Sequence, residues 1–326
     1  MKEENKIVYI RQDDRQYIDK RDKVQRVISK ILLRVRYEII ENGIIIIIPK
    51  YKTYNEFICK AITKKIIGIV KDLSNYVFAF DNKLEFLENR YNGIEILKGK
   101  TLMKELSVDI LENIFKQNNQ IMSLENIYIF VNEYSKNNVY LINKMVHYFK
   151  TVNIITENLK YYRRLENNLY NQGILITVSN NKRKSVVNAK YIINIDFEKE
   201  KIINYKINNY AVILNCTKEK NTFEKSFRGI VINNVNLNIE EDSKEYIREF
   251  YGSIDNNIFI ESVLVSDKQQ NGKIDYLKNE YNIKIYELFG IRGKISTQEI
   301  KELWFFSIGY WQKVKSDLIY SGTEFN

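Results

Sequence analysis

Two apolar runs joined by a turn form the clearest pattern in the first part of the chain. They are Val35 to Ile40 and Ile44 to Ile48, and Asn42-Gly43 lies between them. Asn-Gly between apolar runs is typical of a β-hairpin. Because the second run is five isoleucines without a polar alternate, it predicts a strand that is buried on both faces.

Around this hairpin, apolar positions alternate between the spacing of helices and that of strands. The sequence predicts helices at 20–34, Thr53–Lys71, Lys83–Arg90 and Thr101–Gln117, and strands at Tyr76–Phe80 and Gly93–Leu97. Thr53 is expected to cap the second of these helices. A polar, Asn-rich segment at 118–125 predicts a boundary between an N-terminal α/β domain, 1–123, and a second domain, 124–326.

The second domain shows a clearer alternation. Its predicted strands are Ile127–Val131, Val152–Ile155, Ile174–Val178, Tyr191–Ile195, Ala211–Leu214 and Gly229–Ile232. Helices are expected between the first three, at Lys136–Lys150 and Leu159–Asn171. Helical crossovers require neighbouring strands to run parallel, and they cover both faces of the sheet. The fold class is therefore predicted as α/β, with a doubly wound, Rossmann-like parallel sheet over roughly 124–240.

The end of the chain predicts an extension of this domain that closes with a helix. Lys244–Tyr251 has helical spacing, and Ile258–Val265 is expected to be a strand. Ser296-Thr297-Gln298-Glu299 has the form of a capping box, in which each end satisfies the backbone N–H of the other. It predicts a terminal helix with Trp304 and Trp311 on one face.

Composition narrows the class of protein. Apolar residues make up 44% and charged residues 28% of the chain, which is typical of a folded globular protein. The longest apolar run is far too short to cross a membrane, and the first residues lack the apolar core of a signal peptide. A cytoplasmic protein without a membrane partner is therefore expected. Abundant Ile, Asn, Lys and Tyr with a single proline indicate a low-GC bacterial genome.

Known catalytic and metal-binding motifs are missing from the sequence. It has neither the GxxxxGK[ST] loop of P-loop NTPases nor the GxSxG turn of α/β-hydrolases. One histidine and two cysteines leave no His-rich metal centre and no disulfide scaffold, so no metal site is predicted. The sequence predicts no complete catalytic constellation and leaves open whether the protein is an enzyme.

A ligand of a parallel sheet binds beyond the carboxyl ends of the strands, near the point where the strand order reverses. The candidate binding residues follow the first three strands of the second domain: Asn132, Ser135, Thr156, Glu157, Asn158, Ser179, Asn180, Lys182 and Arg183. Lys182-Arg183-Lys184 is the most informative cluster. Three cations after a strand, at the expected entry of a helix, suit a phosphate, although the helix dipole favours anions there. A small anionic ligand is the expected partner.

The order of elements over about 124–217 resembles an NAD(P)-binding Rossmann-type domain of the shikimate dehydrogenase and glutamyl-tRNA reductase kind. The similarity covers a second strand that closes on Thr156-Glu157-Asn158 and a fourth strand followed by Asp196. It implies NAD(P) as cofactor, with Thr156 or Glu157 at the adenosine ribose. The turn Asn132-Glu133-Tyr134-Ser135-Lys136 contains none of the glycines that let the backbone approach a pyrophosphate. The resemblance therefore extends to the fold more readily than to the cofactor.

Three hypotheses follow. The first is a Rossmann-like protein, enzymatically vestigial or inactive, that binds a small anionic ligand or has lost its ancestral one. The second is an NAD(P)-dependent oxidoreductase with an atypical dinucleotide turn. The third is a nucleic-acid-associated protein that uses the basic stretches 1–36, with 11 basic and 6 acidic residues, and 50–71, with 6 basic and 1 acidic.

Overall fold

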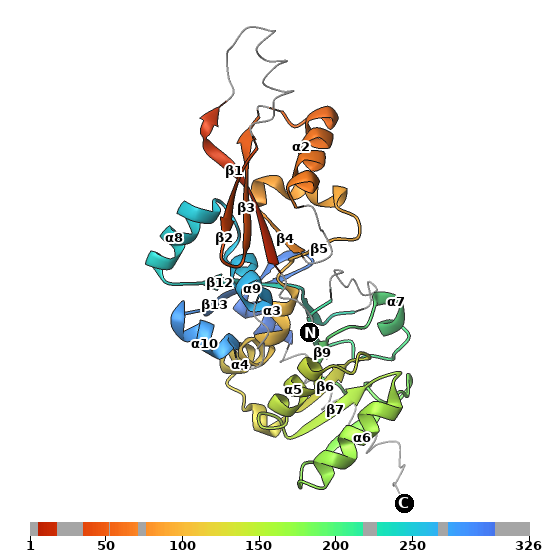
Figure 1. Ribbon diagram of the computed structural model, residues 1–326. Helices are drawn as coiled ribbons and strands as arrows, with labels where there is room; N and C mark the ends of the chain where they lie inside the picture. The colour runs from red at the N-terminus through yellow and green to blue at the C-terminus, as the bar shows by residue number, and fades with distance from the viewer. Residues whose placement is uncertain are drawn as a thin grey trace, which may run out of the picture. The chain divides into compact units, whose positions relative to one another are not determined.

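The structure is a computed structural model, and it describes residues 6–17, 35–51, 53–70, 76–217, 227–266 and 273–303 (Figure 1). The predicted helix at 20–34 and the stripe of Trp304 and Trp311 lie outside these ranges. The chain divides into two compact units: unit 1 comprises 1–102 and 237–284, and unit 2 comprises 103–236 and 285–326. The domain boundary predicted near residue 124 differs from this division and stays a prediction, and the sequence leaves open whether the N-terminal half is an independent domain.

Packing explains why the first division comes before residue 124. Helix α4 (Ser107–Gln117) belongs to unit 2, where the Phe115 ring centroid lies 4.4 Å from that of Tyr191 and 6.0 Å from that of Phe149. The polar segment that follows α4 is therefore a surface loop of unit 2. The spacing of apolar residues also gives no indication that residues 237–284 pack with the N-terminal residues as part of unit 1.

Unit 1 is built on a five-stranded sheet of order β2-β3-β1-β4-β5. The strands are β1 (Lys6–Tyr17), β2 (Arg36–Ile40), β3 (Gly43–Lys50), β4 (Tyr76–Phe80) and β5 (Glu95–Ile96). Strand β2 pairs antiparallel with β3, whereas β3, β1, β4 and β5 run parallel. This confirms the hairpin at Asn42-Gly43. The five isoleucines are between 0% and 9% exposed, which confirms burial on both faces.

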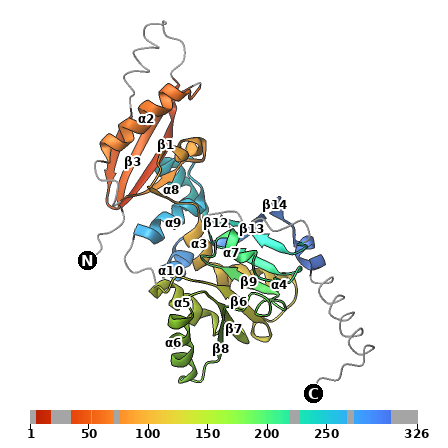
Figure 2. The same cartoon turned by 90° about the vertical axis from the view of Figure 1, so that its right-hand side faces the viewer.

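Helices cover both faces of this sheet (Figure 2). The helices against the sheet are α2 (Glu56–Ile69), the 3₁₀ segment η2 (Asn82–Arg90) and α9 (Asn256–Ser266). Helices α8 (Glu241–Tyr251) and α10 (Lys273–Glu280) pack against α9, and α3 (Lys100–Glu105) crosses the end of unit 1 at Leu102. On one face, Ile58 and Ile62 of α2 share a core with Val8 and Ile10 of β1. On the other, the Tyr9 hydroxyl lies 2.6 Å from the Ser262 hydroxyl of α9.

The predicted strand at Ile258–Val265 is wrong, because these residues lie in helix α9. The helix is buried on several sides, among its apolar residues as well as at Asn257, Glu261 and Ser262. A buried helix leaves no polar face to mark its 3.6-residue period, so a short β-branched apolar run looks like a buried strand.

The expected cap of α2 is also wrong. The helix begins at Glu56, and the Asn55 side chain accepts a hydrogen bond of 3.0 Å from the Ile58 amide, while Thr53 is exposed two residues further out. We expect Asn55→Ala to lower the free energy of unfolding by about 1 kcal/mol, since the cap is lost. Thr53→Ala should change it by less than about 0.5 kcal/mol. Urea denaturation of both variants measures this, and equal losses would contradict the assignment.

Unit 2 contains a six-stranded sheet of order β11-β10-β9-β6-β7-β8, and all its pairings are parallel. The strands are β6 (Asn126–Phe130), β7 (Thr151–Ile155), β8 (Ile176–Ser179), β9 (Tyr191–Asn194), β10 (Val212–Asn215) and β11 (Ile230–Ile232). Numbered along the chain, the order is 3-2-1-4-5-6, which is that of doubly wound dinucleotide-binding folds. The predicted Rossmann-like α/β fold is confirmed, and the strand order reverses between β6 and β9.

The connections of unit 2 include α5 (Lys136–Met145), α6 (Leu159–Tyr170) and α7 (Lys199–Ile202). Phe130, Ile192 and Phe197 form a buried cluster with the segment before β9 and with α7. This cluster fixes the strand ends at which the order reverses.

A third, smaller sheet has the strand order β12-β13-β14 and contains the last strands of the described chain. Its strands are β12 (Asn234–Asn238), β13 (Lys284–Gly290) and β14 (Gly293–Ile295). After β14, the Ser296 hydroxyl accepts from the Glu299 amide at 3.1 Å, and the Glu299 carboxylate accepts from the Ser296 amide at 2.7 Å. The predicted capping box is confirmed. No helix in the described part of the chain is long and apolar enough to span a bilayer.

Candidate functional site

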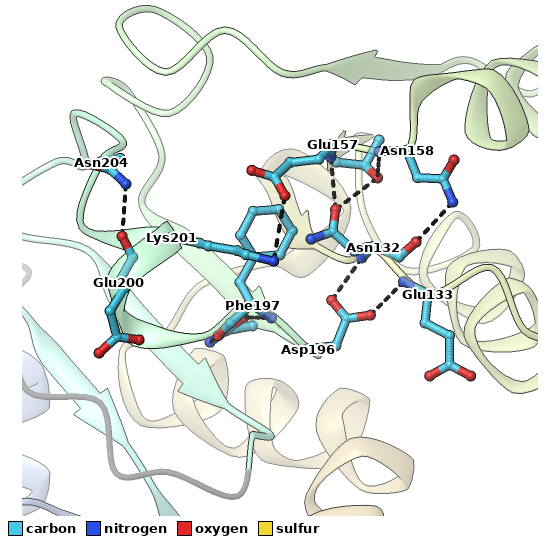
Figure 3. A network of polar contacts seen from close by, with 11 residues as sticks. Asn132, Glu133, Glu157, Asn158, Asp196, Phe197, Glu200, Lys201 and Asn204 are labelled. Atoms are coloured by element: carbon cyan, nitrogen blue, oxygen red, sulfur yellow. Dashed lines mark hydrogen bonds and ion pairs between the residues drawn. The ribbon is translucent and has the colours of Figure 1, made fainter.

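The loops after β6, β7 and β9 meet where the strand order of unit 2 reverses (Figure 3). Asp196, just after β9, points its carboxylate at the turn after β6. There it accepts hydrogen bonds from the backbone amides of Asn132 and Glu133, both at 2.7 Å. Successive amides at this position of a Rossmann-like fold attract the phosphate of a ligand. A carboxylate of the chain itself occupies them here.

The rest of this turn is also engaged within the chain. The Asn132 side-chain oxygen accepts from the Glu157 amide at 2.8 Å, which ties the turn to the end of β7. The Asn132 carbonyl accepts from the Asn158 side chain at 3.4 Å, and the Glu133 carbonyl accepts from the Tyr162 hydroxyl at 2.7 Å. The predicted residues Asn132, Glu157 and Asn158 are thus brought together, and their polar groups are engaged with one another.

Three predicted hydroxyl residues serve local turns. Ser135 accepts from the Asn138 amide at 3.2 Å and caps α5. Thr156 accepts from the Asn158 amide at 3.0 Å, and Ser179 accepts from the Asn181 amide at 3.1 Å. None of these bonds tests whether Ser135, Thr156 or Ser179 binds a ligand, so that role stays a prediction.

Asn158 occupies the N-cap position of α6, but its side chain makes no capping hydrogen bond. The side chain points to Asn132 instead, and donates to its carbonyl (Figure 3). The first turn of α6 therefore keeps amide groups that no cap residue satisfies, at the positive end of a 12-residue helix.

The basic cluster Lys182-Arg183-Lys184 follows β8 as exposed turns, where a helix entry was expected. Asn180, also a candidate, is exposed beside it. The Asn181 side chain accepts from the amides of Arg183 and Lys184, both at 3.1 Å. The cluster meets no helix dipole because no helix begins there. Its charged groups form no ion pair within the described residues.

Burial shifts the pKa values of two charged groups near the point where the strand order reverses, those of Asp196 and Lys104. It raises the pKa of the Asp196 carboxyl, against the two amide hydrogen bonds and the Lys104 ammonium, which lower it. Lys104, on α3, is half-buried, and burial lowers its pKa although Glu105, Glu133 and Asp196 favour the charged form. Sequence reasoning missed Lys104, because it precedes β6 and a rule based on strand ends cannot select it.

The described residues contain no group of three or more His, Cys, Asp or Glu that could hold a metal ion. Both cysteines, Cys59 and Cys216, are buried. Burial raises the pKa of the Cys59 thiol, which makes it a poor nucleophile.

The two basic stretches of the nucleic-acid hypothesis are described only in part. In the stretch 50–71, Lys60 of α2 lies 3.6 Å from Glu56. Residues 18–34 of the other basic stretch lie outside the described chain, so the N-terminal nucleic-acid hypothesis stays a prediction.

Comparisons with known proteins add nothing to the fold assignment, which rests on the strand order. No protein-family model and no curated protein matches the sequence. A putative aspartate carbamoyltransferase from Trypanosoma cruzi is 11% identical with a TM-score of 0.24, over 68% of this chain and 74% of that one. An ornithine carbamoyltransferase from Pyrococcus furiosus is 10% identical with a TM-score of 0.26, over 66% and 73%. A putative aspartate carbamoyltransferase from Leishmania major Friedlin is 11% identical with a TM-score of 0.24, over 66% and 72%.

At such scores these similarities carry no argument about activity. These three proteins are carbamoyltransferases. The confirmed part of the resemblance is the Rossmann-like α/β fold, which rests on the strand order.

Proposed function

We propose that unit 2 is a binding domain for a small anionic ligand at the carboxyl ends of β7 and β8, and that it neither holds a dinucleotide beside β6 nor transfers hydride. The observation that carries this proposal is the carboxylate of Asp196 on the amides of Asn132 and Glu133. A ligand phosphate that used these amides would have to displace it.

Electrostatics oppose a pyrophosphate beside that carboxylate. Two unit charges 4 Å apart repel by about 4 kcal/mol at the effective dielectric of a protein surface. That is roughly a thousandfold in affinity for each close pair of charges. The turn also lacks glycine, so the backbone of Glu133 and Tyr134 carries side chains where a dinucleotide needs close approach. The alternative of an NAD(P)-dependent oxidoreductase has no comparable support.

One strand further along, the same edge favours an anion. The first turn of α6 is uncapped by Asn158, and its Lys160 is exposed. Lys182-Arg183-Lys184 follows the neighbouring strand, and the ends of the two strands are joined by the hydrogen bond of 3.0 Å from the Thr156 amide to the Ser179 carbonyl. Helix amides and cations together suit a phosphate or a carboxylate.

Thermal denaturation with added ligand tests the proposal. We expect millimolar pyrophosphate to raise the melting temperature, because a ligand that binds only the native state stabilises it by mass action. Replacing Lys182, Arg183 and Lys184 by Ala should abolish the shift, while Lys150→Ala should retain it. Lys150 is the matched control because it is exposed at the opposite end of the sheet, just before β7.

Two results would overturn the proposal. One is a rise of several degrees with NAD or NADP that pyrophosphate does not reproduce. The other is a pyrophosphate shift that persists in the triple variant, since the anion would then bind elsewhere.

A further inference from the structure

We infer that this edge of unit 2 binds single-stranded nucleic acid, with phosphates on its cations and a base stacked on Tyr161. The inference rests on the proposed function, because the phosphates would use the same helix start and basic turns. It names the class of ligand to which the anionic group belongs.

A row of three tyrosines provides the stacking surface. Tyr162 is fully buried, and its hydroxyl donates to the Glu133 carbonyl at 2.7 Å. The Tyr134 ring packs edge-on against Tyr162, with ring centroids 5.4 Å apart. Tyr161 then stacks on Tyr134 at 5.5 Å and an interplanar angle of 28°. Tyr134 and Tyr161 are 43% and 44% exposed, so an anchored ring system reaches from the core to the solvent.

Such a surface is preorganised for a base. Tyr161 stacks on Tyr134, which itself packs against the buried ring of Tyr162. The Tyr161 ring therefore has part of its side-chain freedom restricted before a ligand stacks on it. Every base offers a flat face to an aromatic ring, so stacking of this kind tolerates any sequence. A duplex hides those faces between its base pairs, and therefore the geometry favours a single strand.

The surrounding charge suits a polyanion. Between 159 and 184 the sequence has six cations and one carboxylate, Glu166, a net charge of +5. All six cations are exposed, and none forms an ion pair within the described residues: Lys160, Arg163, Arg164, Lys182, Arg183 and Lys184. Of the nearby carboxylates, Glu157 lies 3.7 Å from Lys201, and Glu133 is exposed beside Tyr134. Elsewhere in unit 2, Lys116 lies 2.9 Å from Glu112 and Lys190 lies 3.4 Å from Glu125.

The fold places the cations and the rings along one edge. Tyr161 lies in the first turn of α6, after the carboxyl end of β7, and Tyr134 follows β6. Lys182 follows β8, and β6, β7 and β8 are consecutive neighbours in the sheet. Parallel strands lie about 4.8 Å apart, so the loops after β7 and β8 form a continuous edge along which a nucleic-acid backbone can run. Tyr134, in the loop after β6, contributes only by supporting the ring of Tyr161.

Fluorescence anisotropy with labelled oligo-U and oligo-dT of about 20 nucleotides, longer than the site of a typical single-strand-binding module, tests the inference on the full chain. We expect saturable binding that weakens as salt rises, because cations that contact phosphates release counterions. Tyr161→Ala should weaken binding by about 5- to 100-fold. Tyr170→Ala is the matched control and should bind within about twofold of the native chain, because Tyr170 is exposed at the other end of the same helix.

The cations have their own readout. Replacing Lys182, Arg183 and Lys184 by Ala should flatten the plot of log affinity against log salt by about 0.7 for each phosphate that the variant no longer neutralises. Lys150→Ala should leave the slope of this plot unchanged. Thermal denaturation shows whether each variant is folded.

Three outcomes would overturn the inference: no binding of the oligonucleotides, equal binding of a duplex of the same length, or an unchanged affinity in Tyr161→Ala. If pyrophosphate still stabilises the chain in any of these cases, the proposed function stands and only the nucleic-acid assignment fails. If pyrophosphate has no effect and the oligonucleotides do not bind, both fail.

Discussion

Replacing Asp196 by Ala is expected to lower the free energy of unfolding of unit 2 by about 2–4 kcal/mol. Two backbone amides, of Asn132 and Glu133, lose the acceptor that now lies 2.7 Å from each. A donor left without a partner in a partly buried turn costs about 1–3 kcal/mol. Chemical denaturation measures the global loss. Because the chain has two compact units, hydrogen exchange at the two amides gives the local measurement.

Glu198→Ala is the control for this prediction. Glu198 lies two residues after Asp196 and is exposed, without a capping hydrogen bond to α7, so its loss should cost less than about 0.5 kcal/mol. Equal stability and equal exchange in the two variants would show that the carboxylate does not hold the turn.

The dependence of stability on pH is a second test of the role of the Asp196 carboxylate. Because burial raises the Asp196 pKa, the native state binds this proton more tightly than the unfolded state does. The stability that Asp196 contributes is therefore largest at acidic pH and falls as pH rises from the ordinary value of 3.8 through the raised pKa. The stability of the native chain relative to Asp196→Asn should decrease over that window. An increase would contradict the assigned direction.

The parallel sheet of unit 2 could be predicted from the sequence because each element carries its own local signal. Apolar runs of strand length are separated by helices long enough for a crossover, as between β6 and β7. That a carboxylate of the chain itself occupies the Asn132 and Glu133 amides could not be predicted in this way. It depends on β9 lying beside β6, which places Asp196 against Asn132 although 64 residues separate them.

The row of three tyrosines could not be predicted from the sequence either, for a related physical reason. Tyr134 and Tyr161 lie on segments that follow different strands, and only the pairing of β6 with β7 brings their rings together. The basic turn after β8 was recognisable as a run of charges. That no carboxylate of the described residues pairs with it is a property of the folded chain.

In unit 1, the misassigned α9 contains the residue with the largest expected effect on stability. Glu261 is 1% exposed, and its carboxylate accepts from the amides of Gly99 at 2.5 Å, Thr101 at 2.6 Å and Leu102 at 3.4 Å. These amides open helix α3. Glu261→Ala should lower the free energy of unfolding of unit 1 by about 3–5 kcal/mol, because several buried donors lose one shared acceptor. Urea denaturation followed by circular dichroism measures the loss.

Two further variants separate the hydrogen bonds from the space that the side chain fills. Glu261→Met keeps most of the volume and offers no strong acceptor, whereas Glu261→Gln keeps one carbonyl oxygen. The expected order of stability is therefore native, Gln, Met, Ala, with the exposed Glu245→Ala of α8 close to native. If Met proves as stable as Gln, the amides of α3 have found another acceptor, and the carboxylate is not what joins the start of α3 to α9.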